Sequence, residues 1–154
     1  MTDQDPEFVV LGETRVYDFY ALTTAIRLIE RGAKFIATNP DVSGPSDEGT
    51  LPAAGSVAAM IQAATGKAPY FVGKPNPVMI RAGLNKIGVH SENAAMVGDR
   101  MGTDVRAGVE AGMRTFLVLS GSTSAEQVSN FPFRPYRLYN GIGDLIRYVN
   151  PSSN

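Results

Sequence analysis

The stretch that decides the fold is AAMVGDRMGTD, residues 94–104. It opens with four apolar residues, 94–97, which predict a strand buried on both faces, as in a parallel sheet. Ligands of such sheets bind beyond the carboxyl ends of the strands, and Asp99 stands at that end. Thr103 or Asp104 is expected to cap the helix that follows, which would place Asp104 beside the same crevice.

The two acids, Asp99 and Asp104, allow two interpretations. Neighbouring carboxylates repel each other unless a cation lies between them, so the pair favours a metal or cation site. Alternatively, one acid is a solvated turn residue and the other an ordinary helix cap, since acids are common at helix starts. The spacing alone leaves both interpretations open.

Composition narrows the class of protein. The 154 residues carry a formal net charge of −1, with 44% hydrophobic and 19% charged residues, which fits one globular domain. The chain has no basic cluster, so nothing in its charge pattern points to nucleic acid or a membrane surface as a partner. The chain has no Cys and a single His, His90, in an expected surface loop, which argues against thiolate or histidine metal sites. Its start lacks a signal peptide, and no apolar run spans a membrane, so a soluble, cytoplasmic protein is expected.

Strands and helices are expected to alternate along the whole chain. Apolar runs indicate strands at 8–11, 34–37, 70–73, 94–97, 115–119 and 137–139; helical spacing indicates helices at 18–31, 53–65, 77–87, 105–111, 125–128 and 142–149. Asp18 and Asn76 are expected helix caps. Residues 41–52 are rich in Gly, Pro, Ser and acids and are expected to form a long loop. This order predicts parallel β-α-β units in a layered α/β fold, with a separate lobe before Tyr70.

A lysine joins the acids in this scheme. Lys74 ends one expected strand and Asp99 ends the next, so adjacent parallel strands would present both at one rim. An ammonium group and a metal-holding carboxylate together favour a phosphate site. Taken alone, Lys74 is more simply a surface lysine. The sequence contains neither a dinucleotide-binding fingerprint nor a P-loop. A receiver domain would place its lysine after the acids, whereas Lys74 precedes Asp99, which argues against that class.

At this point the chain resembles a known family. The residues 73–77, GKPNP, followed by 97–104, VGDRMGTD, look like the third and fourth motifs of the haloacid dehalogenase superfamily, and most closely those of its NagD-like class of sugar and nucleotide phosphatases. Supporting stretches are 12–14, 37–41, 65–67 and 119–121. The similarity runs over almost the whole chain.

The resemblance implies roles for individual residues. Asp99 would bind Mg²⁺ directly, and Asp104, in the same metal and catalytic site, would orient the metal's shell through water or its neighbours. Lys74 would steady the nucleophile and a phosphoryl oxygen. Asn39 and Asp41 become candidate substrate contacts, although an ordinary Asx-Pro turn explains each equally well.

The resemblance also implies a division of the chain. Residues 7–69 would be the carboxyl-terminal half of a substrate-selecting cap, 70–150 part of an incomplete Rossmann-like core, and 1–6 and 151–154 disordered ends. The resemblance implies a small phosphorylated sugar, polyol or nucleotide as substrate. Caps of this type often pair, which allows a homodimer through the cap but leaves the oligomeric state open. The acidic loop 41–48 has no aromatic residue to stack on a base and leans toward sugar or polyol phosphates.

One departure from the family pattern matters most. The family's nucleophile is the first Asp of an Asp-x-Asp-Gly motif that follows an apolar strand. The only Asp-x-Asp here is Asp3-Gln4-Asp5, which Pro6 follows and no strand precedes. We therefore expect this chain to be the carboxyl-terminal portion of a longer phosphatase and to be inactive alone. The alternative is a non-catalytic module that binds phosphate or a partner through an unpaired sheet edge.

Overall fold

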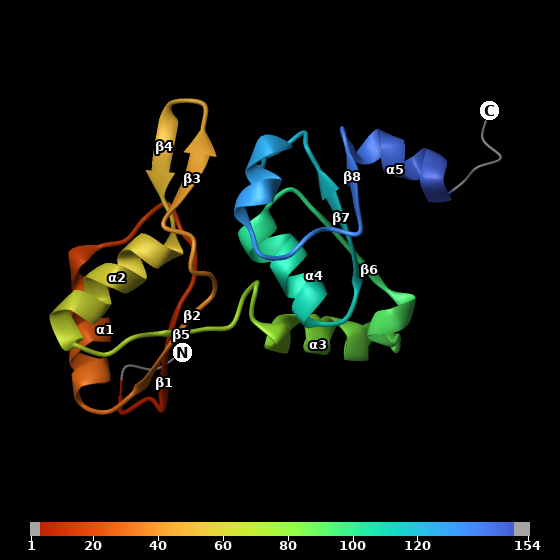
Figure 1. Ribbon diagram of the computed structural model, residues 1–154. Helices are drawn as coiled ribbons and strands as arrows, with labels where there is room; N and C mark the ends of the chain where they lie inside the picture. The colour runs from red at the N-terminus through yellow and green to blue at the C-terminus, as the bar shows by residue number, and fades with distance from the viewer. Residues whose placement is uncertain (1–3, 150–154) are drawn as a thin grey trace. The chain divides into compact units, whose positions relative to one another are not determined.

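The computed structural model describes residues 4–149 (Figure 1). These residues form a mixed α/β protein with parallel sheets, which confirms the predicted fold class. They divide into two compact units, with the break between Gly73 and Lys74. Of the expected disordered ends, residues 1–3 and 151–154 lie outside the described residues, as does residue 150.

The first unit is built on a three-stranded parallel sheet. Its strands are β1 (Phe8–Leu11), β2 (Lys34–Ala37) and β5 (Tyr70–Phe71), in the order β1-β2-β5. Two helices, α1 (Phe19–Glu30) and α2 (Ala54–Thr65), pack on the sheet. Side chains alternate between the two faces along β1 and β2, so every second side chain points into the core. The buried cluster consists of Leu11, Ile29, Phe35, Ala37, Ala58 and Ile61.

Both predicted side-chain caps are confirmed. The carboxylate of Asp18 accepts a hydrogen bond from the Ala21 N–H at 2.7 Å and begins α1. The side chain of Asn76 accepts one from the Val78 N–H at 2.9 Å and begins α3 (Pro77–Ile87). Each cap satisfies an amide that the first helical turn leaves without a partner.

The predicted loop at 41–52 is wrong. This segment forms an antiparallel hairpin of β3 (Ser43–Ser46) and β4 (Gly49–Pro52). Gly49 has φ +118°, and the Ser46 hydroxyl donates to the Gly49 carbonyl at 2.8 Å, which closes the turn. The composition concealed these strands because they have few β-branched residues and β4 is exposed along its whole length.

The strand before Lys74 also differs from expectation. It is only two residues long, and it pairs with β2 in the first unit, with Tyr70 opposite Ile36. Among the described strands it therefore shares no sheet with β6, the strand that ends before Asp99, and the prediction that these two strands are paired neighbours is wrong. Sequence order suggested adjacency, but hydrogen-bonded pairing is a tertiary property.

The second unit holds another three-stranded parallel sheet. It consists of β6 (Ala95–Gly98), β7 (Arg114–Val118) and β8 (Arg137–Tyr139), in the order β6-β7-β8. A π-helical turn, η2 (Met101–Val105), leads directly into α4 (Arg106–Glu110). Four further helices complete the described part of the unit: α3, η1 (Ser91–Asn93), η3 (Glu126–Asn130) and α5 (Ile142–Val149).

The core of the second unit lies between its sheet and the turn that follows β6. Its buried cluster consists of Met101, Val105, Leu117 and Val128. On β7, Phe116 instead contacts the rings of Tyr136 and Tyr139, at centroid distances of 5.8 and 5.9 Å. Within residues 4–149 we find no helix that combines the length and the hydropathy needed to cross a membrane.

Candidate active site

Asp104 is the centre of the candidate site. The predicted cap by Thr103 or Asp104 is wrong, because the helical turn begins earlier, at Met101. Asp104 therefore lies inside the turn, and its side chain points back toward the end of β6. Its Oδ2 accepts hydrogen bonds from the N–H groups of Asp99 at 3.2 Å and Arg100 at 3.1 Å. The side chain is only 6% exposed.

Gly98 makes room for this arrangement. A Cβ at position 98 would overlap Cβ, Cγ and Oδ2 of Asp104, all closer than real Cβ contacts come. Only a residue without a side chain lets the carboxylate rest against the last residue of β6. The Gly-Asp sequence at the end of this strand thus has a steric cause.

Lys74 is brought to the same place. Its Nζ lies 2.6 Å from Oδ1 of Asp104, while its side chain remains 41% exposed. A charge-assisted bond of this length compensates a buried carboxylate strongly. The structure thus joins Lys74 to the acidic loop directly through Asp104, and to Asp99 through the hydrogen bonds that Asp104 accepts.

Asp99 occupies the carboxyl end of β6, as expected. Its Oδ2 accepts a hydrogen bond from the Ser122 N–H at 2.8 Å. Partial burial raises the pKa of Asp99, but hydrogen bonds from the backbone and side chain of Ser122, from its own backbone, and the charge of Arg100 outweigh burial and hold that pKa below its usual value. The group is therefore an anion at neutral pH.

The loop after β7 completes the site, and the sequence interpretation gave its residues no role. Besides Ser122, it supplies Thr123, whose N–H donates to the Asp99 carbonyl at 3.1 Å. The Thr123 hydroxyl oxygen accepts from the Met101 N–H at 3.3 Å. Strand order could have identified this loop, because it follows the strand paired with β6 and so lies at the same edge of the sheet.

The donor set suits Mg²⁺ in part. Among residues 4–149 there is no group of three or more His, Cys, Asp or Glu side chains that could enclose a metal. Mg²⁺ commonly uses only one or two carboxylates, with water and substrate phosphate for the rest. The anionic Asp99 fits such a ligand, whereas both oxygens of Asp104 already accept bonds from Lys74 and from backbone amides.

The other candidates, Asn39 and Asp41, belong to the first unit. The Asn39 side-chain oxygen accepts the Asp41 N–H at 3.1 Å, which is an Asx-turn, and its amide nitrogen donates to Glu13 Oε2 at 3.1 Å. The structure thus places the five candidate residues in two groups: Lys74, Asp99 and Asp104 in the second unit, and this pair in the first.

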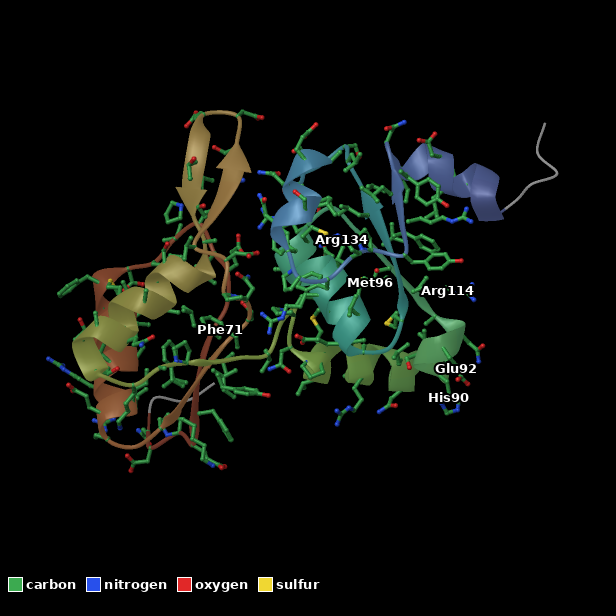
Figure 2. The ribbon with its side chains drawn as sticks, viewed as in Figure 1. Phe71, His90, Glu92, Met96, Arg114 and Arg134 are labelled. Atoms are coloured by element: carbon green, nitrogen blue, oxygen red, sulfur yellow. The ribbon has the colours of Figure 1, made fainter. Side chains whose placement is uncertain are left out.

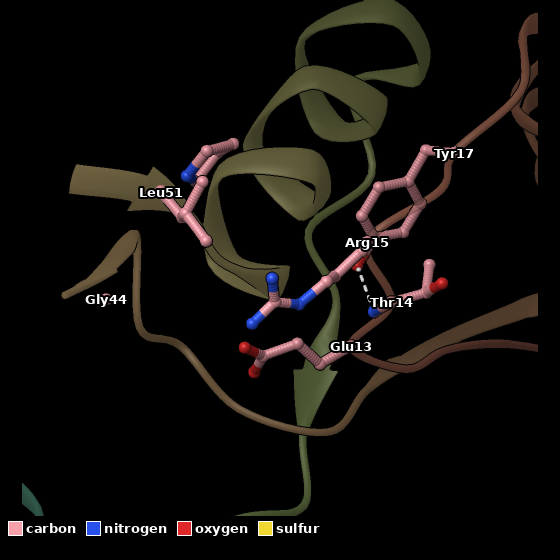
Figure 3. Close-up of a pocket in the computed structure, with 7 residues that line it drawn as sticks. Glu13, Thr14, Arg15, Tyr17, Gly44 and Leu51 are labelled. Atoms are coloured by element: carbon pink, nitrogen blue, oxygen red, sulfur yellow. Dashed lines mark hydrogen bonds between the residues drawn. The ribbon is translucent and has the colours of Figure 1, made fainter. Parts of the chain in front are cut away.

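A pocket of about 560 Å³ opens in the first unit (Figure 3). It lies between the loop after β1 and the β3–β4 hairpin, and its lining includes Glu13, Arg15, Tyr17 and Leu51. The Tyr17 hydroxyl donates to the Gly12 carbonyl at 2.9 Å, which fixes the shape of the loop. The sequence interpretation missed this pocket because it took the hairpin for a loop.

The single histidine lies away from the acidic cluster. His90 precedes β6, whereas Asp99 follows it, so the length of the strand separates them. Figure 2 shows His90 and Glu92 together near the η1 turn, and both residues are exposed. This placement agrees with the expected surface loop.

Comparison with known proteins indicates the family that the sequence motifs resemble. Residues 71–145 match the family described as HAD-hydrolase-like. The dihydroxyacetone phosphatase of Corynebacterium glutamicum is 61% identical over 94% of this chain and 53% of its own length. The ribonucleotide monophosphatase NagD of Escherichia coli is 44% identical over 94% of this chain and 57% of its own. A 4-nitrophenylphosphatase structure from Thermotoga maritima superimposes with a TM-score of 0.89 at 40% identity, covering 96% of this chain and 57% of that one.

These findings agree with the motifs and with the fold. The chain belongs to the haloacid dehalogenase superfamily, and within it to the NagD-like class. It spans about half the length of the curated relatives it matches.

Proposed function

We propose that this chain carries the lysine and acidic part of a Mg²⁺-dependent phosphomonoesterase site. The observation that carries the proposal is the cluster at the end of β6, where an ammonium group, a buried carboxylate and an anionic Asp99 meet. Fixed charges of both signs at the end of a parallel strand suit a phosphoryl group and its counter-ion. The phosphatase names of the relatives point the same way.

Each residue receives a defined task in this proposal. Asp99 is a Mg²⁺ ligand, and the ion would supply positive charge to the phosphoryl oxygens. Lys74 holds the acidic loop through Asp104 and offers its exposed ammonium group to a phosphoryl oxygen. Asp104 orients Lys74 and the loop rather than competing for the metal.

The attacking group would come from polypeptide outside this sequence. The 154 residues contain no Asp-x-Asp-Gly. In the complete site an aspartate would attack phosphorus, the alcohol would leave with a proton, and water would then release phosphate from the aspartyl-phosphate. We propose small sugar, polyol or nucleotide phosphates as substrates, with Asn39 and Asp41 in the substrate-selecting unit, and a cytoplasmic location for the enzyme.

The test is a chimera with the C. glutamicum relative. The part of that relative which this chain does not match is joined in front of this chain, and hydrolysis of an aryl phosphate is measured with and without Mg²⁺. We expect Mg²⁺-dependent activity in the chimera and none in the 154-residue chain. In the chimera, Asp99→Ala should lower kcat/KM by at least about 10²-fold.

The control is Glu92→Ala, which removes an exposed acid near η1 and should leave kcat/KM unchanged. Activity of the 154-residue chain alone, or an Asp99→Ala chimera as active as its parent, would overturn the proposal.

A second candidate function rests on the edge of the second sheet. Among the described strands, β6 pairs only with β7, so its other edge carries no strand. An apolar edge strand of this kind accepts an added strand from another polypeptide. A non-catalytic role would use this edge to bind a partner chain, and it predicts binding without Mg²⁺-dependent hydrolysis in the chimera.

A further inference from the structure

We propose that Thr123 is a positioning residue that fixes the direction in which Asp99 presents its carboxylate. The inference deepens the proposed function, on which it rests. It assigns a role to the loop after β7, a segment that contributes neither the lysine nor the acids of the site.

Two hydrogen bonds tie Thr123 to the loop after β6. Its N–H donates to the Asp99 carbonyl, and its hydroxyl oxygen accepts from the Met101 N–H. The residue is 7% exposed, so water does not readily replace these bonds. Together they fix the backbone on both sides of Arg100.

The neighbouring residues of the same loop act on the side chain of Asp99. The Ser122 N–H donates to Asp99 Oδ2 at 2.8 Å, and the Ser122 hydroxyl accepts from Arg100 Nε at 3.2 Å. Gly121 leaves the necessary space, because a Cβ there would overlap the Asp99 carboxylate. Thr123 anchors this loop, so it determines where the Ser122 donor lies.

The same anchoring reaches Asp104. Met101 is the first residue of the η2 turn, and the Arg100 carbonyl accepts the N–H groups of Asp104 at 3.0 Å and Val105 at 3.1 Å. A displaced Met101 would rotate this turn and loosen the contact of Asp104 with Lys74. Loss of the Thr123 hydroxyl should therefore disturb the acidic cluster as a unit.

The test compares Thr123→Val with a matched substitution, Thr115→Val. Thr115 is also buried, and its hydroxyl oxygen accepts from the Tyr136 N–H at 3.2 Å, away from the acidic loop. Amide hydrogen exchange of the 154-residue chain is followed by NMR, with the Leu117 amide of the core as internal reference. We expect Thr123→Val to speed exchange at Met101 and Ser122 by roughly 10-fold relative to Leu117, the factor that one buried hydrogen bond supplies. Thr115→Val should leave that ratio unchanged, and Thr123→Ser should restore it.

A second measurement joins this residue to the metal. Mg²⁺ is titrated while the amide resonances of Asp99 and Arg100 are followed. Substitution of groups that orient a metal ligand typically weakens affinity about 10- to 100-fold, and we expect a loss of that size for Thr123→Val but not for Thr115→Val.

The two proposals can fail separately. If Mg²⁺ does not shift these resonances in the unmodified chain, the metal role of Asp99 fails, while the exchange rates still decide the role of Thr123. If exchange at Met101 and Ser122 is the same in Thr123→Val and Thr115→Val, the positioning role is overturned, whatever Mg²⁺ does.

Discussion

At the scale of single residues, the Asp104 carboxylate accepts three hydrogen bonds although it is buried. One oxygen accepts the Lys74 ammonium group and the other accepts two backbone amides. Burying a carboxylate to 6% exposure is unfavourable unless donors of this kind compensate it. Removing the ammonium group would leave a charge with amide partners alone.

Lys74→Met tests this dependence. The substitution keeps most of the apolar stem but removes the charge, and we expect it to lower the free energy of unfolding by about 1–3 kcal/mol. Urea unfolding measures the loss. The control is Lys34→Met, which breaks the exposed Lys34–Glu7 ion pair at 3.1 Å and should cost less than about 1 kcal/mol. Equal losses in the two variants would show that the Lys74–Asp104 pair contributes no more than a surface ion pair.

At the scale of elements, the site is made by two loops at the carboxyl ends of adjacent parallel strands. The loop after β6 carries Asp99, and the loop after β7 carries the groups that donate hydrogen bonds to Asp99. Close approach between these parts depends on glycine. Gly98 faces the Asp104 side chain and Gly121 faces Asp99, and neither position has room for a Cβ.

Gly98→Ala should therefore be strongly unfavourable. The added methyl group would push the Asp104 carboxylate away from the amides of Asp99 and Arg100. We expect a loss of about 2 kcal/mol or more, read from the urea midpoint. Gly83→Ala is the comparison, because Gly83 lies inside α3 with open space around its Cβ position. That change should be neutral or stabilising by up to about 1 kcal/mol. If both variants unfold at the same urea concentration, steric contact at Gly98 does not hold the site together.

At the scale of the whole molecule, the described residues make two units, each with its own small parallel sheet and core. In the second unit β6 is both the strand that delivers Asp99 and the edge of its sheet. Its sequence, Ala-Met-Val-Gly, has no charge, and Val97 is 36% exposed. Natural proteins usually protect such an edge with charges or another segment.

An apolar edge strand that pairs on one side only, as β6 does among the described strands, predicts association that a charge would suppress. We expect the 154-residue chain to show concentration-dependent association in sedimentation velocity, and Val97→Lys to reduce it. Val109→Lys is the matched control, since Val109 is 42% exposed but lies on α4, where no strand can add. Association that both lysines reduce equally would indicate general hydrophobic contact and not pairing at β6.

Much of this protein follows from its sequence alone. Periodicity identified most helices and strands, and the caps Asp18 and Asn76 followed from side-chain chemistry within four residues of each helix start. The acidic motif indicated a ligand site at the end of β6. These features depend on local geometry, so neighbouring residues are enough to determine them.

Tertiary structure decided the rest. It paired the strand before Lys74 with β2, folded an exposed segment into the β3–β4 hairpin, and turned Asp104 back toward β6. It also brought Thr123 to Met101 across a separation of 22 residues. Strand pairing and long-range hydrogen bonds depend on which surfaces meet after the chain folds, and periodicity along the sequence carries no record of that choice.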